Sequence, residues 1–130
     1  MPAGAKVLQV RTPNGDTLHG IHVPPSAAAR KPKTLVLGFG GNAWNGQDVA
    51  NYLHELYPDV HVVTFHYRGY PPSTGRPSAE ALLADAPLVY DAAVQRVHPE
   101  RTVVAGFSIG SGVAASLVER RPVKGIILVT

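Results

Sequence analysis

The stretch Val104-Ala105-Gly106-Phe107-Ser108-Ile109-Gly110-Ser111-Gly112 decides the fold of this chain. It lies between a short apolar run at residues 102–105 and a helical pattern at residues 113–121. A buried strand is therefore expected to pass into a helix through a tight turn at residues 106–112. Glycine at two residues on either side of Ser108 permits a sharp bend with the serine at its apex, because a side chain at either place would collide with the turn. Ser108 is therefore expected in strained backbone with a positive φ. The pattern Gly-x-Ser-x-Gly between strand and helix predicts that Ser108 is a nucleophile above a sheet.

A nucleophilic serine needs hydrogen-bond donors for the negative charge that develops on the attacked oxygen. One N–H is expected from Ile109, and a second from the loop that follows an earlier apolar strand at residues 34–37. That loop begins Gly38-Phe39-Gly40-Gly41-Asn42, and its glycines let the backbone approach a ligand closely. The alternative is a strand-end turn that glycine keeps open without any ligand.

The same loop has a competing interpretation as a dinucleotide site. Gly38-x-Gly40-x-x-Ala43 after a strand fits the phosphate-binding fingerprint. That fingerprint requires an acidic residue at the end of the next strand, where Phe65-His66-Tyr67 stands instead. Asp59 has about the right separation but precedes the strand. Nucleotide binding is therefore the third hypothesis for this chain.

The rest of the sequence alternates between strand and helix patterns. Asn14-Gly15 between apolar alternations predicts a hairpin whose two turn residues both have positive φ. Further strands are expected at residues 34–37, 60–65, 102–105 and 125–129, and helices at 48–56, 78–97 and 113–121, with Ser78 as a cap. Such alternation predicts the α/β class, with a mainly parallel sheet covered by helices on both faces. Residues 1–130 are expected to form one domain.

Composition excludes several function classes. The chain has 130 residues, a net charge of +3 and no cysteine, so disulfides and thiolate chemistry are excluded. Its basic residues form short clusters at residues 30–33 and 120–121 without interleaved aromatics, so no nucleic-acid partner is expected. No apolar run is long enough to span a bilayer and the first residues lack a signal-peptide core. A cytoplasmic protein without a membrane partner is expected.

At this point the sequence resembles the α/β-hydrolase superfamily, and within it small bacterial serine hydrolases. Tyr67-Arg68-Gly69-Tyr70 matches the loop that follows the fourth strand of that family. Residues 40–45, Gly-Gly-Asn-Ala-Trp-Asn, match the loop His-Gly-Asn-Ala-x-Asn after the third strand, with Gly40 where the family usually has His. The resemblance covers residues 34–129 well and the hairpin loosely. It implies the strand order 1-2-4-3-5-6.

The resemblance also implies site residues. The N–H of Asn42 joins that of Ile109 in an oxyanion hole, and Gly41, Gly106 and Gly110 support the site. Trp44 either lines the acyl pocket or packs on the helix below it. The family needs no metal and no organic cofactor, and its substrate is a small molecule with an acyl bond.

The family places its triad in the order Ser, acid, His. After Ser108 this chain has Glu119 as its only acid and no histidine, since all six histidines come earlier. The triad acid and His are therefore expected outside these residues, and His66 is the best placed histidine within them. The implied function is hydrolysis of an ester or related acyl bond through an acyl-enzyme at Ser108. The alternative is a non-catalytic relative that binds a small molecule or a partner.

The last predicted strand, residues 125–129, is apolar on both faces. Such a strand belongs inside a parallel sheet, because an exposed apolar edge invites pairing with another chain. The chain is therefore expected to be the incomplete, N-terminal side of its fold. Either the remaining strands lie elsewhere in the protein, or the chain associates through this strand with a chain that supplies the missing C-terminal half.

Overall fold

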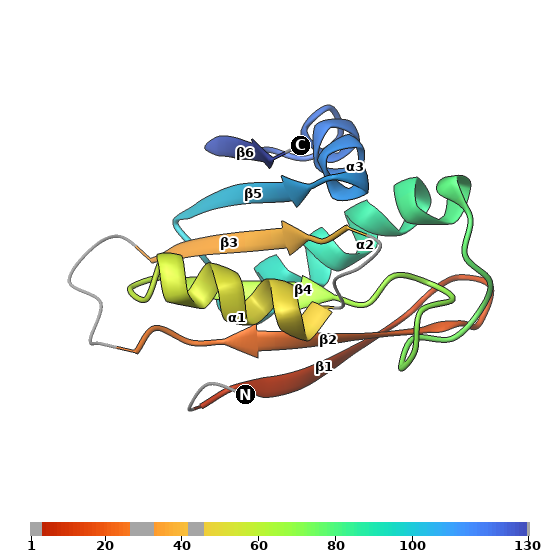
Figure 1. Ribbon diagram of the computed structural model, residues 1–130, viewed down its shortest axis with the longest axis horizontal. Coiled ribbons are helices and arrows are strands. Elements are labelled where there is room, and N and C mark those ends of the chain that lie inside the picture. Colours follow the sequence, from red (N-terminus) through yellow and green to blue (C-terminus); the bar gives the residue numbers. More distant parts are fainter. Residues whose placement is uncertain (1–3, 27–32, 42–45, 130) are drawn as a thin grey trace.

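The computed structural model describes residues 4–26, 33–41 and 46–129. These residues form a six-stranded sheet with the order β1-β2-β4-β3-β5-β6, which confirms the predicted order (Figure 1). The strands are β1 (Lys6–Arg11), β2 (Thr17–Val23), β3 (Thr34–Phe39), β4 (His61–Phe65), β5 (Arg101–Phe107) and β6 (Gly125–Val129).

The central and C-terminal strands of the sheet are parallel. β4, β3, β5 and β6 run in one direction, while β2 is antiparallel to both of its neighbours, β1 and β4. The carboxyl ends of the parallel strands therefore meet at one edge of the sheet, the edge where ligands bind in folds of this class.

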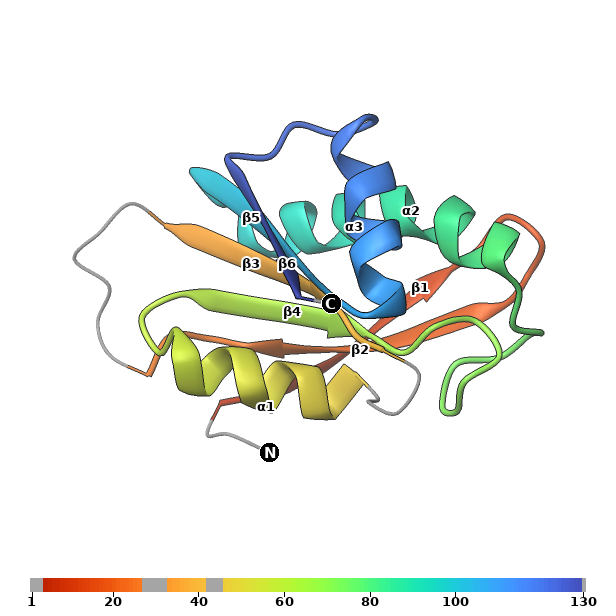
Figure 2. The same cartoon turned by 45° about the horizontal axis from the view of Figure 1, so that its top comes forward.

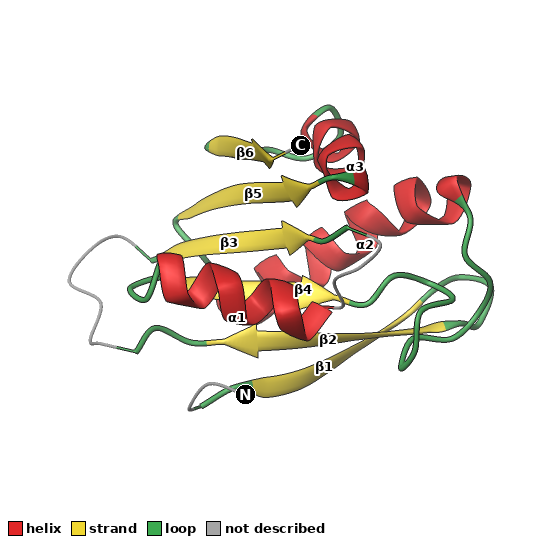
Figure 3. Cartoon of the chain, viewed as in Figure 1, coloured by secondary structure: helices red, strands yellow, loops and turns green. Residues whose placement is uncertain are grey.

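Helices cover both faces of the sheet, as predicted. α1 (Gly46–Leu56) packs on one face, and α2 (Ala79–Val97) and α3 (Ile109–Val118) pack on the other (Figures 2 and 3). The two buried clusters follow the alternation of the strands. In β3, Leu35 and Leu37 point toward α2 and α3, whereas Val36 points toward α1.

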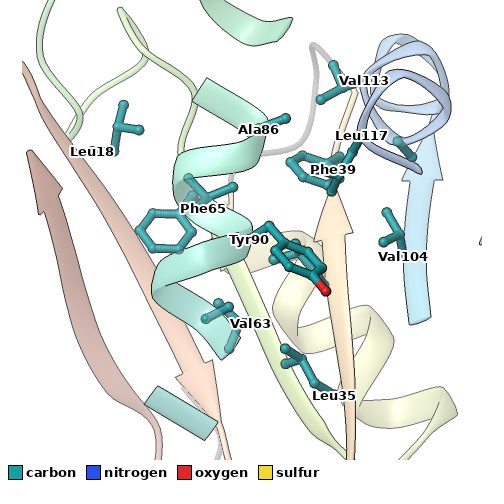
Figure 4. Close-up of a cluster of buried hydrophobic side chains, with 14 of the residues drawn as sticks. Leu18, Leu35, Phe39, Val63, Phe65, Ala86, Tyr90, Val104, Val113 and Leu117 are labelled. Atoms are coloured by element: carbon teal, nitrogen blue, oxygen red, sulfur yellow. The ribbon is translucent and has the colours of Figure 1, made fainter. Parts of the chain in front are cut away.

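The larger cluster lies between the sheet and α2 with α3. Leu35, Phe39 and Val63 of the strands meet Tyr90 of α2 and Leu117 of α3 (Figure 4). All of them are at most 7% exposed. Burying each aliphatic side chain of this kind contributes about 1.5–3 kcal/mol, so this cluster fixes both helices against the sheet.

The hairpin is confirmed, but the predicted turn is wrong. Residues 12–16 connect β1 to β2, and the N–H of Gly15 donates to the carbonyl of Thr12 (3.0 Å). Gly15 has a positive φ of 92°, whereas Asn14 does not. Pro13 explains the difference, because its fixed negative φ suits the second position of an ordinary β-turn and places Asn14 at the third.

The helix after the β3 loop, α1, and the helix after the Ser108 bend, α3, both begin earlier than predicted. α3 begins at Ile109 instead of residue 113, and α1 begins at Gly46 instead of Asp48. The bend at Ser108 is therefore a single residue, and Gly110 and Gly112 lie inside the helix. In α1, Val49, Ala50 and Leu53 are buried, whereas Tyr52 and Leu56 are 41% and 51% exposed.

Ser78 caps α2 as predicted. Its side-chain oxygen accepts a hydrogen bond from the N–H of Ala81 (3.0 Å), and the helix extends to Val97. This cap satisfies one of the N–H groups that a helix leaves unpaired in its first turn.

At the sheet edge formed by β6, apolar side chains are exposed. Ile126, Leu128 and Val129 are 39%, 49% and 45% exposed, and β5 is the neighbour of β6 in the described sheet. Association through β6 stays a prediction. None of the helices in the described ranges is long and apolar enough to cross a bilayer.

Candidate functional site

Ser108 occupies the bend between β5 and α3. Its backbone angles are φ 54° and ψ −118°, and the residue is exposed. Among the described non-glycine residues, the other positive φ is that of His98, which has ordinary left-handed helical angles at the end of α2. Ser108 lies outside that region, so its conformation costs on the order of 1–3 kcal/mol and is imposed by its surroundings. The predicted positive φ is confirmed, and the role of nucleophile stays a prediction.

Backbone contacts explain the two glycines that flank Ser108. A Cβ atom at Gly106 would lie 2.4 Å from the carbonyl oxygen of Gly110, so the first turn of α3 excludes it, as predicted. A Cβ atom at Gly110 would lie 2.1 Å from the carbonyl oxygen of Phe39, at the end of β3. The second contact joins segments far apart in the sequence, and the spacing of the motif did not identify it.

The loop after β3 lies beside the bend. A Cβ atom at Gly41 would lie 3.2 Å from the Cβ atom of Ser108 and 3.5 Å from the carbonyl oxygen of Phe107. The structure therefore brings Gly41 to Ser108, as the site hypothesis requires. Ile109 is the first residue of α3, so its N–H has no acceptor within that helix. The predicted residues Asn42 and Trp44 lie outside the described residues.

Hydrogen bonds to two further residues, Val129 and Ser111, hold the bend, and the sequence pattern predicted neither of them. The N–H of Ser108 donates to the carbonyl of Val129 in β6 (2.7 Å). The Ser108 carbonyl accepts from the N–H and from the hydroxyl of Ser111 (2.9 and 2.6 Å). A serine three residues after the apex was the available signal for the second contact, since serine commonly satisfies backbone groups in the first turn of a helix.

His66 follows β4 and contacts the start of α1. Its Nδ1 accepts a hydrogen bond from the N–H of Gly46 (3.1 Å). Burial lowers the pKa of His66, and His19 lowers it further, while Asp48 acts in the opposite direction. The neutral ring that accepts this hydrogen bond is thus favoured. His66 is engaged at the helix terminus, where a dinucleotide phosphate would require free N–H groups, so the structure adds no support to nucleotide binding.

The described residues after Ser108, 109–129, contain no histidine that could act as its base. Glu119, the acid after Ser108, lies at the C-terminal end of α3, opposite the end that Ser108 begins. In the described part of the chain, no cluster of three or more histidine and acidic side chains could hold a metal ion.

A second group of histidines lies at the other end of the strands. His22 of β2 and His61 of β4 are stacked, with their Nε2 and Nδ1 atoms 2.9 Å apart. Arg96 Nε donates to His22 Nδ1 (2.8 Å). Burial is the main cause that lowers the pKa of His22 to about 4, with His61, Arg96 and Lys33 acting in the same direction.

No family model matches the chain, but individual proteins are similar to it in sequence. An uncharacterised protein of Mycobacterium tuberculosis is 34% identical over 98% of this chain, which spans 46% of that protein. The lysophosphatidylserine lipase ABHD12 of Danio rerio is 38% identical over 66% of this chain, which covers 23% of the lipase. The chain thus spans about half the length, or less, of these relatives.

Solved structures give the same fold. An α/β serine hydrolase homologue from Coxiella burnetii superposes with a TM-score of 0.76 at 18% identity, over 95% of this chain and 61% of that one. An α/β serine hydrolase without lid from Xanthomonas campestris gives a TM-score of 0.75 at 20% identity. The match covers 98% of this chain and 62% of the Xanthomonas chain. By its strand order, its strand–serine–helix bend and these neighbours, the chain has the α/β-hydrolase fold.

Proposed function

We propose that this chain carries the nucleophile of a serine hydrolase that cleaves esters or related acyl bonds. The observation that carries the proposal is the conformation of Ser108. A non-glycine residue with strained angles, fixed by backbone contacts on both sides and exposed at the carboxyl ends of parallel strands, is the arrangement of a nucleophile elbow. A structural turn has no need of that strain.

The reaction follows from this placement. Ser108 Oγ attacks the acyl carbon and loses its proton to a general base, forming a tetrahedral intermediate. The N–H groups of Ile109 and Asn42 hold the oxyanion, which the N-terminal end of α3 also favours. The intermediate expels the alcohol, which takes the proton, and leaves an acyl-serine. Water, deprotonated by the same base, then releases the acid and restores the serine hydroxyl.

The histidine and the acid of this mechanism come from outside the 130 residues. In the described part of the chain, Ser108 forms hydrogen bonds with Val129 and Ser111, not with a histidine or an acid. The chain also spans only 46% of its mycobacterial relative. The name of the ABHD12 relative suggests a monoacylated phospholipid as one substrate to test. We propose the broader class, esters of small molecules, because the bend fixes the chemistry and not the length of the acyl group.

Labelling of the full-length protein with a fluorophosphonate probe tests the proposal. Wild type is expected to become labelled, and Ser108→Ala is expected to abolish labelling without unfolding, since an exposed hydroxyl contributes no core packing. Ser116→Ala is the matched control, because Ser116 lies on α3 away from the bend and bonds Arg120. Labelling that survives Ser108→Ala places the nucleophile elsewhere. An unlabelled wild type favours the non-catalytic alternative, and a saturable response to NAD favours nucleotide binding.

A further inference from the structure

A half-buried tyrosine contacts the loop that lies against Ser108. Tyr67, just after β4, donates its hydroxyl to the carbonyl of Gly40 (2.7 Å). Its ring packs against the larger core cluster and lies edge-on to Tyr70, with the ring centroids 6.1 Å apart. Burial raises the pKa of the Tyr67 phenol, so the hydroxyl keeps its proton and remains a donor well above neutral pH.

The acceptor of this hydrogen bond belongs to a tightly packed peptide. A Cβ atom at Gly110 would lie 2.9 Å from the Gly40 carbonyl oxygen, and Gly41 packs against the side chain of Ser108. The Gly40–Gly41 peptide therefore lies between Tyr67 and the bend. Because a trans peptide directs its carbonyl and its N–H in opposite directions, a hydrogen bond to the Gly40 carbonyl also fixes the direction of the Gly41 N–H.

His66, the neighbour of Tyr67 in the sequence, contacts the first residue of α1, which follows the β3 loop. His66 Nδ1 accepts from the N–H of Gly46, and Thr64 Oγ1 donates to the carbonyl of Gly46 (2.5 Å). The end of β4 thus holds Gly40 with one side chain and Gly46 with two others. These contacts bridge different strands, which explains why the pattern along the chain did not reveal them.

We propose that Tyr67 is a positioning residue of the hydrolytic site, whose hydroxyl fixes the Gly40–Gly41 peptide against Ser108. The inference rests on the proposed function, because it assigns to Tyr67 the placement of backbone beside the nucleophile. Tyr67 does not touch the reacting atoms. Its effect is on transition-state stabilisation, because the Gly40–Gly41 peptide directly precedes Asn42, whose N–H is a proposed oxyanion donor. Such donors act when they are held in place before the reaction begins.

The test is Tyr67→Phe in the full-length protein. We expect kcat for p-nitrophenyl acetate and the rate constant of fluorophosphonate labelling to fall about 10- to 100-fold, with KM within about twofold, because only the transition state loses stabilisation. Tyr90→Phe is the matched control. Tyr90 donates its hydroxyl to the Pro122 carbonyl (2.6 Å), a similar bond at the opposite end of β5, so its loss leaves both rates unchanged.

A second variant is needed in case Tyr67→Phe does not fold, and it keeps both the aromatic ring and the phenolic oxygen. A polyfluorinated tyrosine at position 67 has a phenol that ionises at lower pH, so it loses its donor as pH rises. We expect kcat to fall with rising pH in this variant and not in wild type. A purely structural role leaves that profile unchanged.

The outcomes separate this inference from the proposed function. Loss of labelling in Ser108→Ala together with wild-type rates in Tyr67→Phe overturns the role of Tyr67 alone. Equal losses in Tyr67→Phe and Tyr90→Phe also overturn it, because general destabilisation then explains both. An unlabelled wild type overturns the proposed function itself.

Discussion

The two ends of the parallel strands are built in different ways. At the carboxyl end, close packing rests on glycines, so that Gly110 lies against the backbone at the end of β3 and Gly41 against the side chain of Ser108. At the amino end, side chains make the contacts, with Arg96 bonded to His22 and His22 to His61. Backbone contacts leave no space for an added atom, whereas side chains can rearrange. The carboxyl end is therefore expected to be rigid and intolerant, and the amino end adjustable.

One histidine at each end of the strands, His66 and His22, has a lowered pKa but a different partner. The pKa values of His66 at the carboxyl end and of His22 at the amino end are both lowered, chiefly by burial. His66 accepts a hydrogen bond at the first residue of α1, whereas His22 joins α2 to the sheet. A lowered pKa alone thus does not identify a functional residue.

The largest effect is expected at the carboxyl end, from Gly110→Ala. Its Cβ atom would lie 2.1 Å from the Phe39 carbonyl oxygen, so the helix or the strand must move, at a cost of about 4 kcal/mol or more. Gly112→Ala is the control on the same helix, since nothing lies within 4 Å of its Cβ position. It is expected to stabilise the protein by up to about 1 kcal/mol. Urea unfolding of both variants measures the difference, and a tolerated Gly110→Ala contradicts the packing described.

Two Arg–Asp pairs, each with its Asp on α2, extend the comparison. Arg68 and Asp85, at the carboxyl end, have side chains only 15% and 8% exposed, whereas Arg121 and Asp91 are 33% and 55% exposed. Asp85→Asn leaves the mostly covered guanidinium of Arg68 with Asp16 as a more distant partner (3.8 Å), and is expected to cost about 3 kcal/mol. Asp91→Asn is expected to cost less than about 1 kcal/mol. Equal shifts in the unfolding midpoint would contradict the contrast between the two ends.

The smallest effect is the pH dependence from His22. Its pKa is about 4 in the folded protein, below the value of 6.5 in the unfolded chain. The unfolded chain therefore binds more protons between these values, so stability is fully present above pH 6.5 and falls as pH drops toward 4. After allowance for solvent screening, the loss is about 1 kcal/mol. Unfolding free energies of wild type and His22→Gln across this range test it, since the variant lacks this part of the slope.

The sequence by itself determined the α/β class and the place of the bend. Apolar runs alternating with helical patterns predict a parallel sheet, because only strands buried on both faces read as continuous apolar runs. Glycine at two residues on either side of Ser108 predicts a positive φ at Ser108, since the required bend is local. The Ser78 cap was predictable for the same reason. The hairpin turn was not, because Pro13 overrode the usual preference of Asn14-Gly15.

Only the tertiary structure decided what surrounds the bend. Phe39 and Gly110 are far apart along the chain, as are Tyr67 and Gly40, and Val129 reaches Ser108 from β6. These partners depend on which strands are neighbours and on their register, a property of the whole sheet. A sequence pattern reports the periodicity of one segment, and therefore it predicts the serine at the apex but not the side chains and carbonyls that hold it there.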